Sequence, residues 1–299
     1  MSDKTHNSNS DYDRFARLYD LEHAQFTADL LLYQNFARRC DGPVLDVGCG
    51  SGRVTLALAR AGSDVVGIDS SFAMLDIARA RVHEAGLSDH IQLLRQDVCA
   101  LDLENQFALV VFSLNGFLHL LTVQAQRAAL HNMARALLPG GILIVDVPNP
   151  HTVFTARQDG KDILRSHFSL PQGDKAFCFV NARTDLAAQI QHITLTYDQV
   201  ADEGKLFDLS GDGPALDTPA FGTLEPNAIT PAQGFQDLAA AGLARRTRID
   251  LDVRFVYRDE MVGLIEQAGL QVDAVYGSYD LDPYEASSHV MLFVAYRPL

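Results

Sequence analysis

The segment VLDVGCGSGR, residues 44–53, decides the fold of this 299-residue chain. Its largely apolar start is typical of a buried parallel strand, and Gly48, Gly50 and Gly52 follow at alternate positions. Glycine carries no side chain that would keep a ligand away from the backbone, so such a loop lets the backbone approach a bound molecule closely. The segment therefore predicts a strand, a ligand-binding loop and a helix in succession.

Strand and helix patterns alternate on both sides of this loop. We expect strands at 43–47, 64–69, 91–97, 107–113 and 142–147, and helices at 53–62, 72–85 and 124–138, the last of which PGG at 139–141 would end. Ser70 or Ser71 can cap the second helix. A helix at 259–268 and strands at 271–277 and 289–297 resume the pattern near the C-terminus. Such alternation indicates an α/β fold with a parallel sheet covered on both faces, in a doubly wound, Rossmann-like order.

Residues 151–257 interrupt this alternation. Period-2 stretches at 176–184, 190–200 and 246–257 predict an inserted antiparallel sheet outside the parallel one. The segment 203–244 is rich in Gly, Pro and Asp and has only a weak helix signal at 231–241. At the N-terminus we expect disorder at 1–10 and helices from Tyr12 to Arg39. The predicted organisation is an N-terminal helical lid (1–39), a ligand-binding domain (40–150 and 258–299) and an inserted β lid (151–257).

The composition excludes several classes of protein. A net charge of −14 is unfavourable for binding nucleic acid, which requires an excess of Lys and Arg. The polar N-terminus has no apolar signal core, and no apolar run approaches the length of a membrane span. The four cysteines and ten histidines show no paired metal-ligand spacing. We therefore expect a cytoplasmic protein, a monomer or homodimer, with neither a metal site nor a membrane or nucleic-acid partner.

The residues around the glycines favour one class of ligand. A phosphate-binding P-loop needs Lys and then Ser or Thr after its last glycine, whereas Arg53 and Val54 stand here. A dinucleotide-binding GxGxxG would need a glycine at 53, which weakens that hypothesis without excluding it. Asp69 and Asp97 end the second and third predicted strands, where carboxylates suit the ribose hydroxyls and the adenine amino group, and Asp46 lies beside the loop. These features predict an adenosine whose tail is not a phosphate, as in S-adenosylmethionine (SAM).

The segment 44–53 and four segments after it resemble the motifs of class I SAM-dependent methyltransferases, in the order in which that family has them. The four segments are VVGIDSSFAML (65–75), LLRQDV (93–98), FALVVFSLNGFLHL (107–120) and LLPGGILIVDVPNP (137–150). The resemblance implies a seven-stranded Rossmann-like sheet in which 289–297 supplies an antiparallel strand inside the sheet. It also implies SAM as cofactor and S-adenosylhomocysteine (SAH) as product.

The resemblance assigns a cofactor role to residues of each motif and of the N-terminal helices. The glycine backbone would lie against the amino acid end of SAM with Asp46 organising the loop, while Asp69 would bind the ribose. Ser113 and Leu114 would face the sulfonium, and Tyr12 and Tyr19 would fold over the cofactor. The full set is Asp46, Gly48, Cys49, Gly50, Gly52, Asp69, Ser70, Met74, Asp97, Val98, Ser113, Tyr12 and Tyr19.

The acceptor and the catalytic groups are less constrained by sequence, because methyl transfer needs alignment more than a dedicated base. Candidate catalytic residues are His119, Asn115 and Tyr19, each with structural packing as the alternative. Candidate acceptor-binding residues are Asn149, Arg254, Tyr257 and Tyr276. We expect methyl transfer to N or O of a small molecule, the acidity favouring an amine. Alternatives are a cyclase or lyase acting on SAM itself, a non-catalytic SAM-binding protein and, more remotely, an NAD-dependent oxidoreductase.

Overall fold

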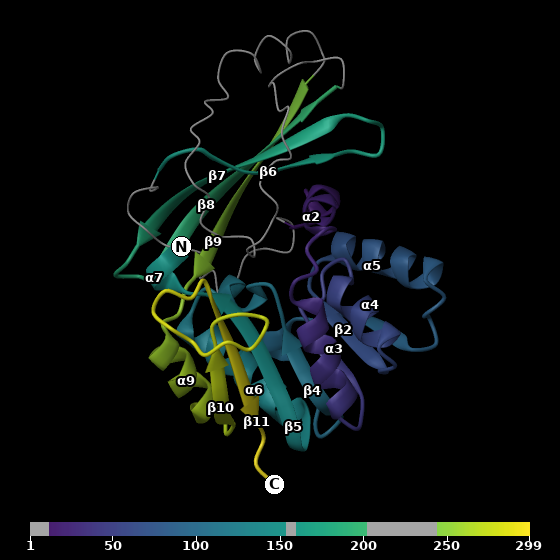
Figure 1. Ribbon diagram of the computed structural model, residues 1–299, viewed down its shortest axis with the longest axis vertical. Coiled ribbons are helices and arrows are strands. Elements are labelled where there is room, and N and C mark those ends of the chain that lie inside the picture. The colour runs from purple at the N-terminus through teal and green to yellow at the C-terminus, as the bar shows by residue number, and fades with distance from the viewer. Residues whose placement is uncertain (1–11, 154–159, 202–243) are drawn as a thin grey trace.

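The protein contains two β-sheets joined through an N-terminal helix (Figure 1). The computed structural model describes residues 12–153, 160–201 and 244–299. The expected disorder at 1–10 and the weak helix signal at 231–241 lie outside the described residues. None of the helices in these three ranges combines the length and the apolar character that a membrane crossing requires.

The larger sheet has seven strands in the order β10-β11-β5-β4-β1-β2-β3. Its strands are β1 (Val44–Val47), β2 (Val65–Asp69), β3 (Ile91–Arg95), β4 (Phe107–Phe112), β5 (Leu137–Pro148), β10 (Gln271–Tyr276) and β11 (Val290–Tyr296). β1 pairs in parallel with β2 and β4, whereas β11 lies antiparallel between β5 and β10. The predicted Rossmann-like sheet, with an antiparallel strand inside it, is confirmed.

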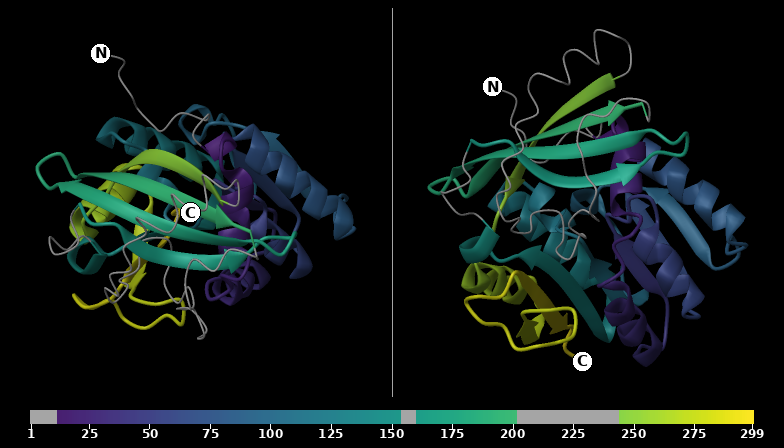
Figure 2. Two further views of the ribbon diagram at one scale, coloured as in Figure 1. Left: turned by 90° about the horizontal axis from the view of Figure 1, so that it is seen from above. Right: turned by 45° about the horizontal axis from the view of Figure 1, so that its top comes forward.

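Helices cover both faces of this sheet because its strands are apolar on both sides. Val44, Leu109 and Val111 belong to a core with α3 (Leu30–Arg39), α4 (Arg53–Arg60) and α5 (Phe72–Glu84). Their neighbours Leu45 and Val110 face the opposite core, with α6 (Val123–Ala136) and α9 (Arg258–Gln267). Figure 2 shows these two helical layers with the sheet between them.

In two segments, the helices and strands have other boundaries than the sequence predicts. α6 ends at Ala136, and residues 137–141 belong to β5 because Gly140 and Gly141 pair with the backbone of Arg297 beyond β11. The N-terminal region is divided into α2 (Ala16–His23) and α3, separated by a turn at 24–29. Three short helices follow strands β3, β4 and β5: η1 (Val98–Ala100), η2 (Gly116–His119) and α7 (Pro150–Val153).

The smaller sheet is antiparallel, as the alternating pattern predicts, with the order β6-β7-β8-β9. Its strands are β6 (Ile163–Ser169), β7 (Lys175–Asp185), β8 (Ile190–Val200) and β9 (Ala244–Arg254). Cys178, Leu195, Tyr197 and Leu251 on one of its faces join the core cluster that contains α6. The sheet therefore packs against the carboxyl-end side of the larger sheet, at the top of Figure 1.

Helix α2 connects the two sheets through charged groups on its different sides. The Glu22 carboxylate, with no exposed side-chain surface, accepts hydrogen bonds from Arg165 of β6 (Nε 2.9 Å) and from the Tyr197 hydroxyl of β8 (2.6 Å). Burial alone would raise the pKa of Glu22, but the Arg165 guanidinium outweighs it and holds the pKa at about 2. Asp20 pairs with Arg81 of α5, at 2.7 Å from Nη1 to Oδ1. α2 is therefore attached to both parts of the molecule.

Replacing Arg165 is expected to destabilise the protein strongly, because Arg165→Met leaves the Glu22 carboxylate buried without its counter-ion. The expected loss in the free energy of unfolding is about 3–5 kcal/mol, measured by urea denaturation. The matched control is Arg248→Met in β9, because Arg248 is exposed and lies 3.5 Å from an exposed Asp250. Equal stabilities of the two variants would contradict the assigned role of the buried pair.

The same pair predicts a pH dependence. Because the folded pKa of Glu22 is about 2, below its ordinary value of 4.5, its contribution to stability is present above pH 4.5. That contribution is lost as the pH falls from 4.5 towards 2. Urea denaturation at several pH values in this window is expected to show a steeper loss of stability in the wild type than in a Glu22→Gln variant.

Candidate functional site

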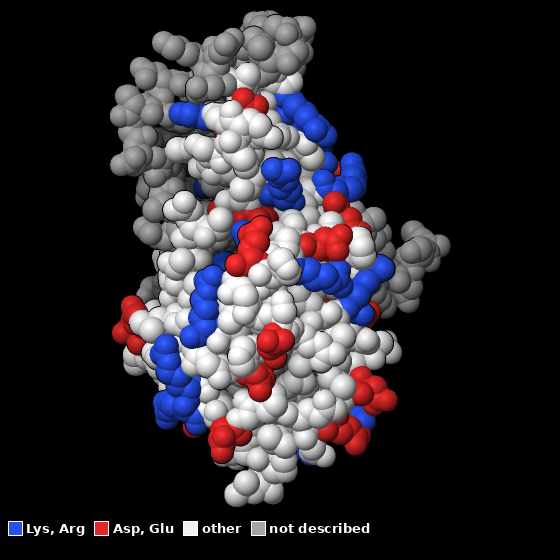
Figure 3. Space-filling view, turned by 90° about the vertical axis from the view of Figure 1, so that its right-hand side faces the viewer, with Lys and Arg blue, Asp and Glu red and all other residues white. Residues whose placement is uncertain are grey.

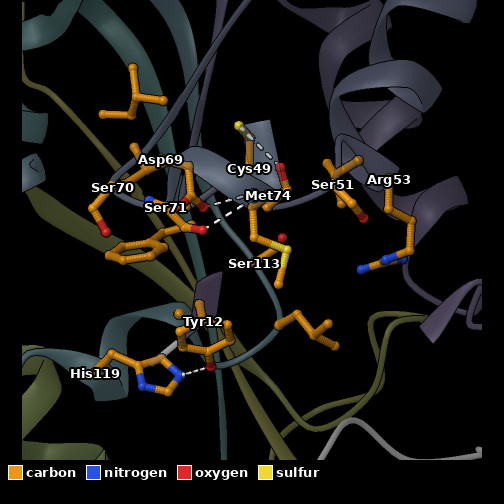
Figure 4. Close-up of a pocket in the computed structure, with 18 of the residues that line it drawn as sticks. Tyr12, Cys49, Ser51, Arg53, Asp69, Ser70, Ser71, Met74, Ser113 and His119 are labelled. Carbon is orange, nitrogen blue, oxygen red and sulfur yellow. Dashed lines mark hydrogen bonds between the residues drawn. The ribbon is translucent and has the colours of Figure 1, made fainter. Parts of the chain in front are cut away.

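A cavity lies at the carboxyl ends of β1, β2, β3 and β4, where parallel sheets of this type bind ligands (Figure 4). The loops that follow these four strands form its floor, and residues 12–24 form the opposite wall. It contains about 1240 Å³ of empty space, its open mouth included.

The glycine loop after β1 has the backbone conformation that its sequence requires. Gly48, Gly50 and Gly52 have φ angles of +63°, +53° and +84°, a region that favours glycine. A Cβ on Gly48 would lie 3.0 Å from the Phe112 ring, so Gly48 is held close to β4. Gly48 and Gly50 line the cavity, whereas Gly52 faces Ala78 of α5 and serves helix packing.

Asp69 at the end of β2 ties two loops of the cavity together. Its Oδ2 accepts a hydrogen bond from the Gly50 amide at 2.8 Å, and its Oδ1 accepts one from the Ser71 amide at 2.8 Å. Burial raises the pKa of this carboxyl. Each carboxylate oxygen has a second lone pair, which leaves Asp69 able to accept from a ligand hydroxyl as well. Ser71 then caps α5 by accepting from the Met74 amide at 3.1 Å.

Asp46, which we expected to organise the glycine loop, has a different position. Its side chain is fully buried beneath the loop and is not among the residues that line the cavity. Its Oδ2 accepts a hydrogen bond from the Thr55 hydroxyl of α4 at 2.6 Å, and burial raises its pKa to about 7. Asp69 at the end of β2 makes the contact with the loop backbone instead, through the Gly50 amide.

The remaining floor of the cavity consists of residues that follow β2, β3 and β4. Met74 and Ser70 lie beside Asp69, and Asp97 and Val98 lie at the adjoining end of β3. The Asp97 side chain accepts from the Cys99 amide at 2.8 Å, which starts η1. Ser113 and Leu114 line the cavity at the end of β4. In Figure 4, Ser113 lies between the Asp69 side and the Arg53 side of the cavity.

Aromatic side chains of the N-terminal segment form the opposite wall. The Tyr12 hydroxyl lies 2.7 Å from His119 Nε2, and the Tyr19 ring stacks on His23 with ring centroids 4.0 Å apart. Burial lowers the pKa of His119 to about 4 and raises that of Tyr19 to about 12. The structure thus brings the predicted Tyr12, Tyr19 and His119 to one cavity, with the imidazole neutral at neutral pH.

Three carboxylates fasten this wall to the loops of the floor. Asp13 accepts from the Ser71 hydroxyl at 2.6 Å, and Asp20 pairs with Arg81, whose Nη1 also donates to the Ser51 hydroxyl at 3.2 Å. The third carboxylate, Asp29, lies in the turn 24–29 before α3 and contacts Arg53, the residue that follows Gly52. There Asp29 accepts from both terminal nitrogens of Arg53, at 2.5 and 2.7 Å.

Sequence reasoning missed His23 and the role of Arg53. His23 Nδ1 donates to the Tyr19 carbonyl at 2.8 Å, so in the neutral imidazole Nε2 carries no proton. Nε2 is buried and has no hydrogen-bond partner among the described residues, and burial lowers the pKa of His23 to about 4. The spacing of four residues between Tyr19 and His23 on one helix face was the signal available in the sequence.

Several predicted site residues lie away from this cavity. Asn115 is buried behind it, and Asn149 donates to the carbonyls of Ala286 and Ser288 at 3.1 and 2.8 Å. Arg254 is buried and is bound by Gln126 at 2.7 Å and by Glu260 of α9 at 2.6 Å.

Tyr257 and Tyr276 also lie outside the residues that line the cavity. Tyr257 is the residue before α9, and its ring lies 5.4 Å from that of His151. Tyr276 is the last residue of β10. The structure therefore does not bring the four predicted acceptor-binding residues to the cavity. Within the three described ranges, no group of three or more His, Cys, Asp or Glu side chains is arranged to hold a metal ion.

Known proteins are similar to this chain in sequence and in fold. Residues 44–141 match the family described as methyltransferase domain. Over 96% of the chain and 97% of the relative, the sequence is 27% identical to the cypemycin N-terminal methyltransferase of a Streptomyces species.

Two solved structures show the same fold. The CcbJ methyltransferase of Streptomyces caelestis is 20% identical, with a TM-score of 0.72 over 98% of this chain and 100% of that one. The SAM-bound amino pentose methyltransferase CalS10 of Micromonospora echinaspora is 19% identical, with a TM-score of 0.56 over 99% of this chain and 92% of that one.

Removing the Asp69 carboxylate is expected to weaken ligand binding without unfolding the protein. In Asp69→Ala the glycine loop loses its hydrogen bond, and we expect the ribose to lose an acceptor, so the affinity for SAH should fall about tenfold or more. The control is Asp64→Ala, an exposed carboxylate just before the same strand. Isothermal titration calorimetry measures both, and an unchanged Kd in Asp69→Ala would contradict the assignment of the cavity.

Proposed function

This chain is a class I SAM-dependent methyltransferase, and from that premise we propose that it transfers the methyl group of SAM to the nitrogen atom of a small-molecule amine. The transfer is an in-line displacement, in which the N–C bond forms as the S–C bond breaks and its electron pair stays on sulfur. The main tasks of the protein are therefore to align the two molecules and to exclude water.

We propose one orientation for the cofactor in the cavity. We propose that the ribose hydroxyls bind Asp69, with the adenine between Met74 and the Asp97–Val98 pair. The methionine half then follows the backbone of Gly48 and Gly50, which places the sulfur near Ser113. In this arrangement the N-terminal wall faces the methyl group, so the proposed catalytic contacts are those of His119, Tyr12 and Tyr19.

The neutral histidines of the wall are the observation that carries the choice of nitrogen. His119 and His23 both have a pKa of about 4, lowered by burial. So weak a base is poorly suited to removing a proton from a hydroxyl acceptor. An amine in its neutral form attacks through its lone pair with no prior loss of a proton, and burial of an amine favours that neutral form.

The names of two similar proteins support an amine as acceptor. A relative that is similar along nearly the whole chain is an N-terminal methyltransferase, and CalS10 is an amino pentose methyltransferase. On the face seen in Figure 3, basic and acidic side chains are interspersed, and the net charge of the chain is −14. We propose that residues 1–39 and the insertion 151–257 act as lids, the insertion selecting the acceptor.

A product assay over matched acceptors tests this proposal. The panel pairs d-glucosamine with d-glucose, and the dipeptide alanylalanine with lactoylalanine, so that each amine has a hydroxyl counterpart. With SAM we expect SAH and a methylated product from at least one amine and from neither counterpart, detected by mass spectrometry. Methylation of the hydroxyl compounds alone would contradict it. Formation of methylthioadenosine from SAM without any acceptor would instead indicate that SAM is itself the substrate.

A further inference from the structure

The turn that follows β4 is held in an unfavourable backbone conformation. Leu114 and Asn115 are consecutive residues with φ angles of +51° and +63°. Neither is glycine, and this region is disfavoured for a side chain as large as leucine. Such a conformation persists only where neighbouring contacts enforce it, and it is concentrated at functional sites.

The same turn forms part of the cavity floor. Ser113, Leu114 and Gly116 line the cavity, whereas the side chain of Asn115 is buried behind it. The turn closes tightly over β4, because a Cβ on Gly116 would lie 2.4 Å from the Phe112 ring. A small displacement of this turn would therefore change the shape of the cavity directly.

Asp146 of β5 provides the contact that enforces the turn. Its Oδ1 accepts a hydrogen bond from the Leu114 amide at 2.7 Å. Phe112 and Val145 are paired residues of β4 and β5, so Asp146 lies beside the chain just where β4 ends. The Asp146 side chain is fully buried and does not line the cavity.

Tyr279, in the connection between β10 and β11, fixes Asp146 in turn. Its hydroxyl donates to Asp146 Oδ2 at 2.7 Å. The Tyr279 ring lies 6.1 Å from the ring of Phe26, whose carbonyl accepts from Arg53 at 3.1 Å. The contacts that hold the 113–116 turn thus extend to the connection between β10 and β11 and to Phe26 of the N-terminal segment.

We propose that Asp146 and Tyr279 are positioning residues, which fix the 113–116 turn against the sulfur and the methionine half of SAM. Neither touches the cofactor, and both act through the Leu114 backbone. The inference rests on the use of SAM and is independent of the nature of the acceptor. It goes beyond the proposed function because it assigns a cofactor-positioning role to residues outside the cavity.

SAH and adenosine distinguish this role from general structural support. SAH carries the sulfur and the amino acid chain, whereas adenosine carries only the part that lies at Asp69, Asp97 and Val98. A displaced 113–116 turn should weaken the binding of SAH and leave adenosine unaffected. Loss of overall structure would weaken both ligands together.

The experiment measures both affinities by calorimetry in the full chain. In Tyr279→Phe, which removes one hydroxyl, we expect the affinity for SAH to fall about five- to tenfold and that for adenosine to stay within about twofold. Tyr284→Phe, in the same connection, is the matched control and should leave both affinities unchanged.

Two substitutions of Asp146 extend the test. Asp146→Ala removes both hydrogen bonds, and its affinity for SAH should fall further than that of Tyr279→Phe. Asp146→Asn should restore binding nearly to the wild-type level, because its amide oxygen accepts from Leu114 and its amino group donates to the Tyr279 oxygen. A neutral side chain suits this position, since burial already raises the pKa of Asp146 to about 6.

Equal losses for SAH and adenosine in Tyr279→Phe, or no loss for either, would overturn the inference. If Asp146→Ala does not fold, Tyr279→Phe and Asp146→Asn still decide the outcome. Failure of the proposed function is separate: methyl transfer to a hydroxyl acceptor would refute the amine proposal while leaving these affinities as expected.

Discussion

The Asp69 carboxylate is the contact on which the site depends. By accepting from the amides of Gly50 and Ser71, it holds together the two loops that follow β1 and β2. Parallel strands place both loops at one edge of the sheet, and the left-handed glycines let the first loop turn back towards the second. The N-terminal wall is fastened to these same loops, so the shape of the cavity follows from their position.

The polar side chains of helix α2 make three kinds of contact. Asp20 binds the core at Arg81, Glu22 binds the inserted sheet at Arg165, and Tyr19 and His23 line the cavity. The helical period makes this possible, because residues four apart share a face while residues two apart lie on nearly opposite sides. Through α2, the cavity wall is in contact with both the loops of the cavity floor and the inserted sheet.

Local patterns predicted the fold well, because central strands such as β1, β4 and β11 carry apolar runs, while the loops after β1 and β2 carry the glycines and a capping serine. Residues whose role depends on distant partners could not be predicted in this way. Arg254 and Asn149 have sequence contexts compatible with an acceptor site, yet their partners at Gln126 and Ser288 lie more than a hundred positions away. The contact of Arg53 with Asp29 spans 24 positions, whereas that of His23 with Tyr19 spans only four, a spacing that the sequence does contain. Tertiary geometry gave the loop contact to Asp69 and not to Asp46.

A crystal structure with bound SAH would show whether this cavity holds the cofactor. We expect the ribose hydroxyls within hydrogen-bond distance of the Asp69 carboxylate and the sulfur beside Ser113 and Leu114. Residues 12–24 should cover the methionine half. SAH bound elsewhere, or bound here with its ribose away from Asp69, would contradict the assignment of this cavity as the methyl-transfer site.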